Sequence, residues 1–190
     1  MFLVFDTETT GLPLWKEPSN HPDQPHIVDL ACSLFNADGE EVDLFDAIIN
    51  PGVPIPDEVS AIHGITNEIA EAEGVEPAHA LENFLALVKR ADVIVGHNVS
   101  FDVRMIRILA ARVLGEKWAN PHPIFCTMRK STNHCRLLGP KARFSEDWQW
   151  PTLTEAVRHF FDEDHSDAHR ARPDVDASAR IFFHLKRIDQ

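Results

Sequence analysis

Four carboxylates and one histidine, spread over three stretches of this chain, have the types and settings needed for chemistry on a phosphate ester. They are Asp6, Glu8, Asp102, Asp174 and His169. Four carboxylates cannot share a small volume without counter-charge, and a pair of divalent metal ions is the natural counter-charge. Two such ions and one base are the groups that cleave phosphodiester bonds in two-metal sites. The sequence therefore points to a metal-dependent hydrolytic site if these residues meet in space.

The first two carboxylates follow a short apolar run. Asp6 and Glu8 are two residues apart at the end of Phe2 to Phe5, and a strand places side chains with this spacing on one face. A bare Asp-x-Glu pair is often only a turn-forming strand end. Here the following Thr9-Thr10-Gly11 favours a ligand site, because glycine lets a ligand approach the backbone closely.

The third carboxylate lies at the junction between an apolar strand at 91–95 and the helix that follows it. Asp102 is at this junction, and α/β sheets place ligands in the loops after the carboxyl ends of their parallel strands. The alternative is that Ser100 or Asp102 merely caps the helix. A cap requires neither the His97-Asn98 pair nor Phe101, so the whole segment favours a functional role.

The fourth carboxylate lies at another predicted helix start. Pro173 begins the helix, Asp174 falls in its first turn, and His169 precedes Asp174 by five residues. The alternative role for Asp174 is a favourable charge at the positive end of the helix dipole. The same spacing recurs from His159, but this residue lies on an amphipathic helix beside two phenylalanines and is interpreted as a packing or surface residue. His165, alone in an acidic run, is expected to be solvated.

The hydrophobic pattern predicts the elements that must position these side chains. Apolar runs predict strands at 2–6, 27–35, 42–49, 91–95 and 124–126. Helical periodicity and capping residues predict helices at 67–72, 77–88, 101–114, 152–161 and 173–188. The Asp38-Gly39 pair favours a hairpin, so the first three strands should form an antiparallel meander. The proline-rich segment Leu12 to Gln24 has neither strand nor helix signal, and 127–150 has no pattern that we can resolve.

Length and composition are those of an ordinary globular domain. The chain has 190 residues, of which 44% are hydrophobic and 25% charged, so we expect one domain, 1–190, with a sizeable core. No apolar run reaches the ~20 residues of a membrane span, and no basic region precedes the first strand, so we expect neither a membrane partner nor a secretory signal. The three cysteines have no metal-binding spacing and are interpreted as reduced thiols, which favours a cytoplasmic protein.

The net charge of −12 hides a strong asymmetry along the chain. Residues 1–88 contain 17 acidic residues and one basic residue, Lys16, a net charge of −16. Residues 89–190 contain 17 Lys and Arg and 13 acidic residues, a net charge of +4. The basic half includes a cluster that could hold a phosphate backbone while carboxylates hold metal: Arg129, Lys130, Arg136, Lys141 and Arg143. The alternative for each of them is a solvated surface.

The three acidic stretches resemble the exonuclease motifs of the DEDD superfamily, which are Asp-x-Glu, His-Asn-x-x-Phe-Asp and His-x-Ala-x-x-Asp. The last motif indicates the histidine branch, DEDDh, which includes the proofreading epsilon subunit of bacterial DNA polymerase III and ribonuclease T. The other branch uses a tyrosine in place of the histidine, and this chain has no tyrosine. The resemblance covers residues 1–188. Besides the three motifs, it includes Ile62–Thr66, with Glu58 five residues before His63, and Cys126–Met128.

This resemblance implies a ribonuclease H-like α/β fold, with a mixed central sheet of about five strands, the first three antiparallel, flanked by helices. It implies that Asp6, Glu8, Asp102 and Asp174 hold two Mg²⁺ or Mn²⁺ ions and that His169 is the general base. Nucleoside 5′-monophosphates would be released from a 3′ end. The last nucleotides would contact a further set of residues: Thr9, Gly11, Leu12, Glu58, His63, Asn98 and Phe101.

The expected substrate is DNA, as single strands or frayed 3′ ends, and a DNA polymerase is a candidate partner. Two alternatives stay open, namely the trimming of RNA 3′ ends, as in ribonuclease T, and a non-catalytic polymerase-binding module. The chain ends soon after the last predicted helix. We leave open both a stand-alone nuclease and a nuclease bound to a polymerase through its surface. The chain departs from compact family members in its long proline-rich 12–24 segment and in Arg170 and Arg172, which add positive charge to the third motif.

Overall fold

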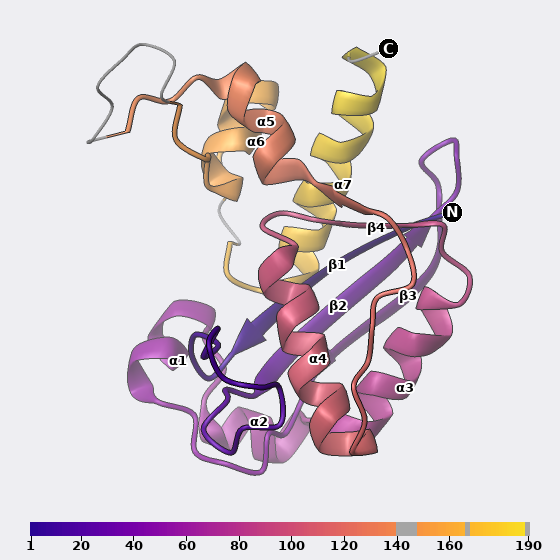
Figure 1. Cartoon of the computed structure of the whole chain (residues 1–190). Coiled ribbons are helices and arrows are strands. Elements are labelled where there is room, and N and C mark those ends of the chain that lie inside the picture. Colours follow the sequence, from indigo (N-terminus) through magenta and orange to yellow (C-terminus); the bar gives the residue numbers. More distant parts are fainter. Residues whose placement is uncertain (140–147, 166–167, 189–190) are drawn as a thin grey trace.

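A computed structural model of the chain describes residues 1–139, 148–165 and 168–188 (Figure 1). The strands are β1 (Phe2–Thr9), β2 (Ile27–Phe35), β3 (Glu41–Ile48), β4 (Val93–Gly96) and β5 (Ile124–Cys126). The helices are α1 (Asp57–His63), α2 (Asn67–Glu73), α3 (Pro77–Val88), α4 (Ser100–Leu114), α5 (Thr127–Cys135), α6 (Leu153–Phe161) and α7 (Ala171–Ile188).

The five strands form one mixed sheet in the order β3-β2-β1-β4-β5. β1 pairs antiparallel with β2, and β2 with β3. β1 pairs parallel with β4, and β4 with β5, so the chain must cross back over the sheet before each parallel strand. Helices α1 to α3 lie in the first crossover and α4 in the second. The predicted mixed sheet with an antiparallel first half is confirmed.

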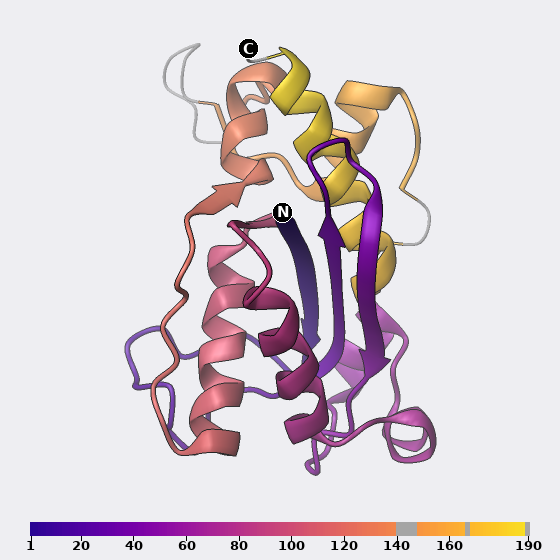
Figure 2. The same ribbon diagram turned by 90° about the vertical axis from the view of Figure 1, so that its right-hand side faces the viewer.

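Helices cover both faces of the sheet, with α3 and α4 on one face and α7 on the other (Figures 1 and 2). Strand β1 alternates between the two layers. Leu3 and Phe5 belong to the core beneath α3 and α4, whereas Val4 belongs to the core beneath α7. Asp6 and Glu8 continue the phase of Val4, so they point to the α7 side of the sheet.

Most predicted elements are found within two residues of their predicted bounds. β1 is longer than expected, because residues 7–9 continue to pair with β2. α7 begins at Ala171, two residues before Pro173, and its first turn accommodates Pro173 because no intrahelical N–H donor is needed there. Both Asp6 and Glu8 therefore lie on a strand, and Asp174 lies in the first turn of a helix.

Helix α5 lies in the segment for which the sequence showed no pattern. Its buried residues are Thr127, Met128, Ser131 and Cys135. Because two of these four are small polar residues, the inward-facing side lacks the continuous apolar stripe that marks an amphipathic helix. Serine and threonine are also weaker helix formers than alanine or leucine. Only packing against neighbouring elements defines this helix.

Candidate active site

Three elements bring the four carboxylates to the carboxyl end of β1. The strand itself supplies Asp6 and Glu8, α4 supplies Asp102, and α7 supplies Asp174. α4 and α7 cover opposite faces of the sheet (Figure 1). Asp102 and Asp174 therefore approach the end of β1 from two sides. The fold thus joins the three separate sequence stretches at one place.

Asp102 is buried and is held by β1. Its Oδ1 accepts hydrogen bonds from the Thr7 N–H at 3.1 Å and from the Thr7 hydroxyl at 2.9 Å. The N-cap of α4 is Val99, and no side chain makes a capping hydrogen bond there. Capping is therefore not the role of Asp102 or Ser100. The carboxylate instead bridges helix and strand.

Glu8, His169 and Asp174 form a tight group in which one ligand atom of each lies within 4.8 Å of the other two. The backbone N–H of His169 donates to Asp174 Oδ2 at 3.3 Å, and the His169 side chain is exposed. His169 has a φ of 71°, in the left-handed region that few non-glycine residues adopt. The turn into α7 thus places an exposed imidazole beside two carboxylates.

A second histidine also contacts Asp174. His165 Nε2 lies 2.5 Å from Asp174 Oδ1, and both side chains are nearly buried. The prediction that His165 is solvated is wrong, because the chain returns over Asp174 before α7 begins. His159, by contrast, is exposed and packs edge-on against Phe160, as expected. Nothing in the acidic run around His165 distinguishes it from a surface histidine.

Asp29 is a fifth carboxylate, and the motifs did not identify it. It lies opposite Glu8 in the β1–β2 ladder and is 1% exposed. Its Oδ2 accepts hydrogen bonds from Arg170 Nε at 2.8 Å and from the Ala171 N–H at 3.3 Å, while Oδ1 is buried without a described partner. The available signal was one acidic residue inside an otherwise uncharged, buried strand.

The two arginines of the third motif bind protein carboxylates. Arg170 pairs with Asp29. Arg172 donates two hydrogen bonds of 2.9 Å to the carboxylate of Glu41 and forms an ion pair with Asp176. The additional positive charge of this motif therefore attaches the start of α7 to β2 and β3.

Burial and mutual repulsion disfavour ionisation throughout the cluster. Burial, followed by the charge of Asp174, raises the pKa of Glu8 to about 8. Burial raises the pKa of Asp102 to about 7, although the hydrogen bonds from Thr7 act in the opposite direction. Burial also raises the pKa of Asp6 and of Asp174, and the neighbouring carboxylates add to this effect at Asp6. A cation among these oxygens would favour the charged forms.

The donor set fits hard divalent cations. The side chains at the site offer carboxylate oxygens, and the ring nitrogens of His165 and His169 lie beside them. Oxygen-only sets suit Mg²⁺ and Mn²⁺, whereas Zn²⁺ sites are usually built from cysteine and histidine. Among the described residues no Lys or Arg forms an ion pair with Asp6, Glu8 or Asp102. The protein supplies little counter-charge of its own at these three residues.

The candidate substrate-binding residues that follow Glu8 form an open edge of the site. Thr9 is buried, and its hydroxyl donates to the Gly11 carbonyl at 2.8 Å. A side chain at Gly11 would project into open space, and Leu12 is 81% exposed. The backbone here is accessible to a ligand.

His63 ends α1 and is buried. Its Nδ1 accepts a hydrogen bond from the Ile65 N–H at 3.1 Å, so the neutral ring carries its proton on Nε2. Burial lowers the pKa of His63 and the Thr9 backbone acts in the opposite direction, while Nε2 makes no hydrogen bond of ordinary distance and angle within the described residues. Glu58 is exposed and lies about 140° around α1 from His63, so the two side chains do not share a helix face.

Asn98 and Phe101 lie in the turn that leads into α4. Asn98 is exposed with a φ of 62°, and its carbonyl accepts the Phe101 N–H at 2.8 Å. Phe101 is half-buried against the core beneath α3 and α4, so ordinary packing accounts for part of its surface. His97 links this turn to two later segments, since its Nε2 donates to the Pro151 carbonyl at 2.9 Å and its Nδ1 lies 3.0 Å from Thr127 Oγ1.

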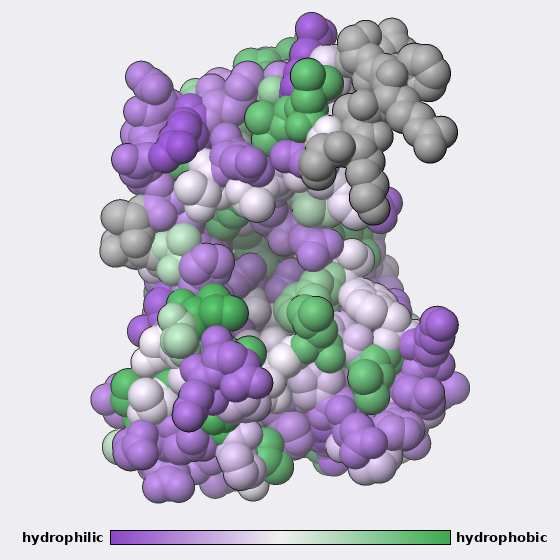
Figure 3. Space-filling model, turned by 90° about the vertical axis from the view of Figure 1, so that its left-hand side faces the viewer, coloured by the Kyte–Doolittle hydropathy of each residue, from purple (hydrophilic) through white to green (hydrophobic). Residues whose placement is uncertain are grey.

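The side of the molecule on which β1 ends and α7 begins is hollowed across its middle (Figures 1 and 3). α5 and α6 lie above the hollow, and α5 exposes two basic residues that lie over aromatic rings. Arg129 is 5.4 Å from the ring centre of Trp150, and Lys130 is 5.9 Å from that of Phe125. Arg136 is exposed after α5, while Lys141 and Arg143 lie outside the described residues.

The chain has a ribonuclease H-like fold in which four carboxylates meet at the end of β1. The chain belongs to the RNase T exonuclease family, whose model matches residues 3–182. The resemblance to the DEDD exonucleases is thereby confirmed, as is the predicted fold class. Divalent cations are general in this family, and the carboxylate cluster is where they would bind.

Curated relatives are replication proteins. The chain is 32% identical to the PolC-type DNA polymerase III of Thermotoga petrophila over 131 residues, which are 68% of this chain and 9% of that protein. It is 26% identical to the DNA polymerase III subunit epsilon of Aquifex aeolicus over 184 residues, which are 97% of this chain and 79% of that protein. The chain thus spans a small part of the PolC-type proteins and most of the epsilon subunit.

Solved structures with the same fold include E. coli exonuclease I in complex with a dT13 oligonucleotide. That structure has a TM-score of 0.74 and 20% identity, over 97% of this chain and 40% of that one. Exonuclease X in complex with 5′ overhanging duplex DNA has a TM-score of 0.63 and 21% identity, over 98% and 92% of the two chains. Within the described residues, no helix has both the length and the apolar character needed to cross a bilayer.

Proposed function

We propose that this protein removes nucleotides from DNA 3′ ends as nucleoside 5′-monophosphates, with two divalent ions held by Asp6, Glu8, Asp102 and Asp174. The observation that carries the proposal is the meeting of four carboxylates with raised pKa values at the end of β1. When bound, Mg²⁺ or Mn²⁺ would stabilise the attacking and leaving oxygens of an in-line displacement. The raised pKa values support this assignment, because bound cations would favour the charged forms of these carboxylates.

His169 is the proposed general base. Its ring is exposed, lies beside Glu8 and Asp174, and makes no hydrogen bond to another described residue. A ring nitrogen is therefore available to accept a proton from an attacking water. A positioned histidine base contributes a factor of about 10²–10⁴ to the rate. The left-handed backbone of His169 and the hydrogen bond from its N–H to Asp174 hold the Cα of His169 close to the proposed metal ligands.

The remaining candidates would position the 3′ end. The accessible backbone from Thr9 to Leu12 would lie against the terminal nucleotide. His63 would donate its Nε2 proton to a sugar oxygen, since this buried donor makes no hydrogen bond of ordinary geometry within the described residues. The exposed Asn98 and the half-buried Phe101 would contact the next nucleotide, where an aromatic ring can stack without reading sequence. Glu58, which is exposed at the start of α1, would be a further contact to the 3′ end.

DNA is the proposed substrate because the relatives include a PolC-type DNA polymerase III and a DNA polymerase III subunit, and because the solved neighbours include complexes with DNA. The same relatives support association with a DNA polymerase. Cleavage of RNA 3′ ends remains the second candidate, and a site that accepts RNA must accommodate the 2′-hydroxyl.

The test is hydrolysis of 5′-labelled single-stranded DNA, duplex DNA and RNA in the presence of Mg²⁺, Mn²⁺ or EDTA. The expected result is a ladder of DNA products that shorten from the 3′ end, with activity lost in EDTA. Matched variants are Asp6→Asn, which removes a ligand, and Asp23→Asn, which changes an exposed carboxylate outside the cluster. Activity in EDTA, or a fully active Asp6→Asn variant, would exclude the proposed metal site.

A further inference from the structure

The segment between β1 and β2, expected to lack strand or helix structure, is built from consecutive tight turns. Backbone hydrogen bonds close the turns at residues 14–17, 18–21 and 21–24. The first is closed by the Glu17 N–H, which donates to the Leu14 carbonyl at 3.1 Å. Trp15 and Lys16 are its two central residues and therefore form its apex.

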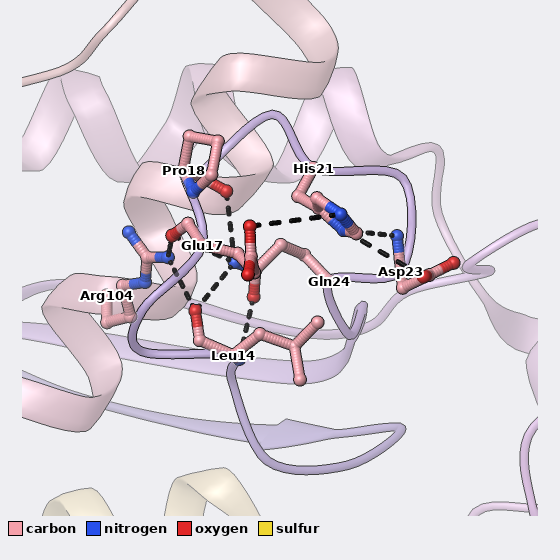
Figure 4. Close-up of polar contacts among 7 residues, drawn as sticks. All are labelled: Leu14, Glu17, Pro18, His21, Asp23, Gln24 and Arg104. Carbon is pink, nitrogen blue, oxygen red and sulfur yellow. Dashed lines mark hydrogen bonds and ion pairs between the residues drawn. The ribbon is translucent and has the colours of Figure 1, made fainter.

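Both ends of this first turn are clamped by side chains (Figure 4). Gln24 is 2% exposed; its Oε1 accepts the Leu14 N–H at 3.0 Å, and its Nε2 donates to the carbonyls of Leu14 and Pro18 at 3.0 Å each. Arg104 donates to the carbonyl of Leu14 at 3.1 Å and to that of Glu17 at 2.6 Å. A buried amide and a guanidinium thus bind the residues on either side of the apex.

The clamp also fixes the turn relative to the carboxylates. The segment leaves β1 soon after Glu8, and Arg104 belongs to α4, the helix that carries Asp102. Further along α4, Arg112 donates to the Gln24 and Pro25 carbonyls, which attaches the other end of the segment. The turn is therefore tied to two of the elements that build the site. A surface held in one conformation loses little conformational entropy when it binds a ligand.

The apex has the chemistry of a contact to nucleic acid. Trp15 is 59% exposed, and Lys16 beside it is also exposed. Lys16 is the one Lys or Arg among the first 88 residues of the sequence, which carry a net charge of −16. An aromatic ring offers a face on which a base stacks, and an ammonium group neutralises phosphate. The two groups stand side by side where the surrounding charge is acidic.

The segment also lies on the relevant side of the molecule. Figure 1 places it below the end of β1, and Figure 2 shows it on the α4 side of the sheet. On the hollowed face, hydrophobic side chains gather along the lower border of the hollow (Figure 3). Leu12 and Leu14, which precede the apex in sequence, are among the exposed hydrophobic residues of the chain.

We propose that the Trp15–Lys16 turn is a preformed platform for the 3′-terminal part of the DNA strand, on which Trp15 stacks on a nucleobase and Lys16 contacts a phosphate. This inference rests on the proposed function, because it requires a DNA 3′ end at the carboxylates. Stacking needs an uncovered base face, so the platform favours unpaired over paired 3′ ends. It adds affinity without reading sequence, since each base has such a face.

The test measures binding of a 5′-fluorescein-labelled oligo-dT by fluorescence anisotropy, in the His169→Ala background with Mg²⁺, over a series of KCl concentrations. Trp15→Ala should weaken binding at least about fivefold, with an unchanged salt dependence, and Trp15→Phe should retain most of the affinity. Lys16→Gln should weaken binding and reduce the slope of log K against log salt by about 0.7. Leu114→Ala is the control, because Leu114 is 50% exposed at the far end of α4.

Binding by Trp15→Ala that equals the background protein, or an equal loss in Leu114→Ala, would overturn the platform. Hydrolysis of the same oligonucleotide by the wild-type protein is measured in parallel. Normal hydrolysis together with binding that does not depend on Trp15 contradicts the platform alone. Absence of both hydrolysis and binding in the wild-type protein contradicts the proposed function as well.

Discussion

His165 Nε2 lies 2.5 Å from Asp174 Oδ1, while the backbone N–H of His169 donates to Oδ2 of the same carboxylate. Protein groups therefore orient both oxygens of Asp174 before a cation binds. Hydrogen bonds of this kind behind a metal ligand fix its orientation, and their loss typically reduces metal affinity or activity by about 10- to 100-fold.

The first prediction concerns this contact. His165→Ala should weaken Mn²⁺ binding about 10- to 100-fold in isothermal titration calorimetry, and excess Mn²⁺ should restore most of the activity. His165→Gln keeps a hydrogen-bond donor and should recover part of the affinity. His159→Ala, at an exposed histidine of α6, is the matched control. Wild-type Mn²⁺ affinity in His165→Ala would remove His165 from the positioning of Asp174.

The second prediction separates His169 from the metal ligands. His169→Ala should lower kcat by about 10²–10⁴ while Mn²⁺ affinity stays near that of the wild type, because a base acts on water and not on the ion. Steady-state kinetics and calorimetry on one preparation provide both values. Unlike His165→Ala, this variant should not recover in excess Mn²⁺. A large loss of Mn²⁺ affinity would instead make His169 a ligand.

The third prediction is a pH dependence of the metal-free protein. Folding raises the pKa of Glu8 to about 8 and that of Asp102 to about 7, above their ordinary values. Groups with a raised pKa bind protons more tightly in the folded state, so they favour folding at low pH and lose this contribution as pH rises. In EDTA the Tm should fall, on the order of 5 °C, between about pH 5 and pH 8. Added Mn²⁺ should raise Tm more at pH 8 than at pH 6. A Tm in EDTA that does not change with pH would contradict the repulsion among these carboxylates.

The fourth prediction follows from the same repulsion. Asp6→Asn removes one charge from the cluster while keeping the shape of the side chain. The variant should abolish metal-dependent hydrolysis and yet raise the Tm of the metal-free protein at pH 8 by roughly 2–4 °C, which corresponds to about 1 kcal/mol in a chain of this length. Differential scanning fluorimetry in EDTA measures this change. A lower Tm would mean that Asp6 makes a stabilising contact in the metal-free state.

The fifth prediction concerns the clamp of the 12–25 segment. Gln24→Ala leaves the Leu14 N–H without its side-chain acceptor, which should cost about 1–3 kcal/mol. Chemical denaturation measures the loss, and hydrogen exchange should become faster for residues 14–24. Asp23→Ala, an exposed residue of the same segment, should change both values little. Unaltered exchange in Gln24→Ala would show that other contacts hold the turns.

Local pattern was sufficient for much of the fold. Alternation along β1 determines that Asp6 and Glu8 share one face, and this depends only on the strand period. Thr152 is the N-cap of α6, and the Thr66 hydroxyl accepts the Ile69 N–H at the start of α2. These features arise within a few residues of chain, so their signals are present in the amino-acid order. The same holds for the Asp38-Gly39 hairpin.

The tertiary structure decided the features that join distant residues. Asp29 and Arg170 are separated by 141 residues, and neither residue type nor spacing pairs them. His165 differs from a solvated histidine only because the chain before α7 folds back onto Asp174. The 12–25 segment has no periodic pattern that would predict its turns. Its conformation is held by Gln24 and by Arg104, which lies on a separate helix. The sequence by itself determined which carboxylates we propose as metal ligands, because those residues stand in local motifs. Their supports are long-range contacts, and these exist only once the elements have packed.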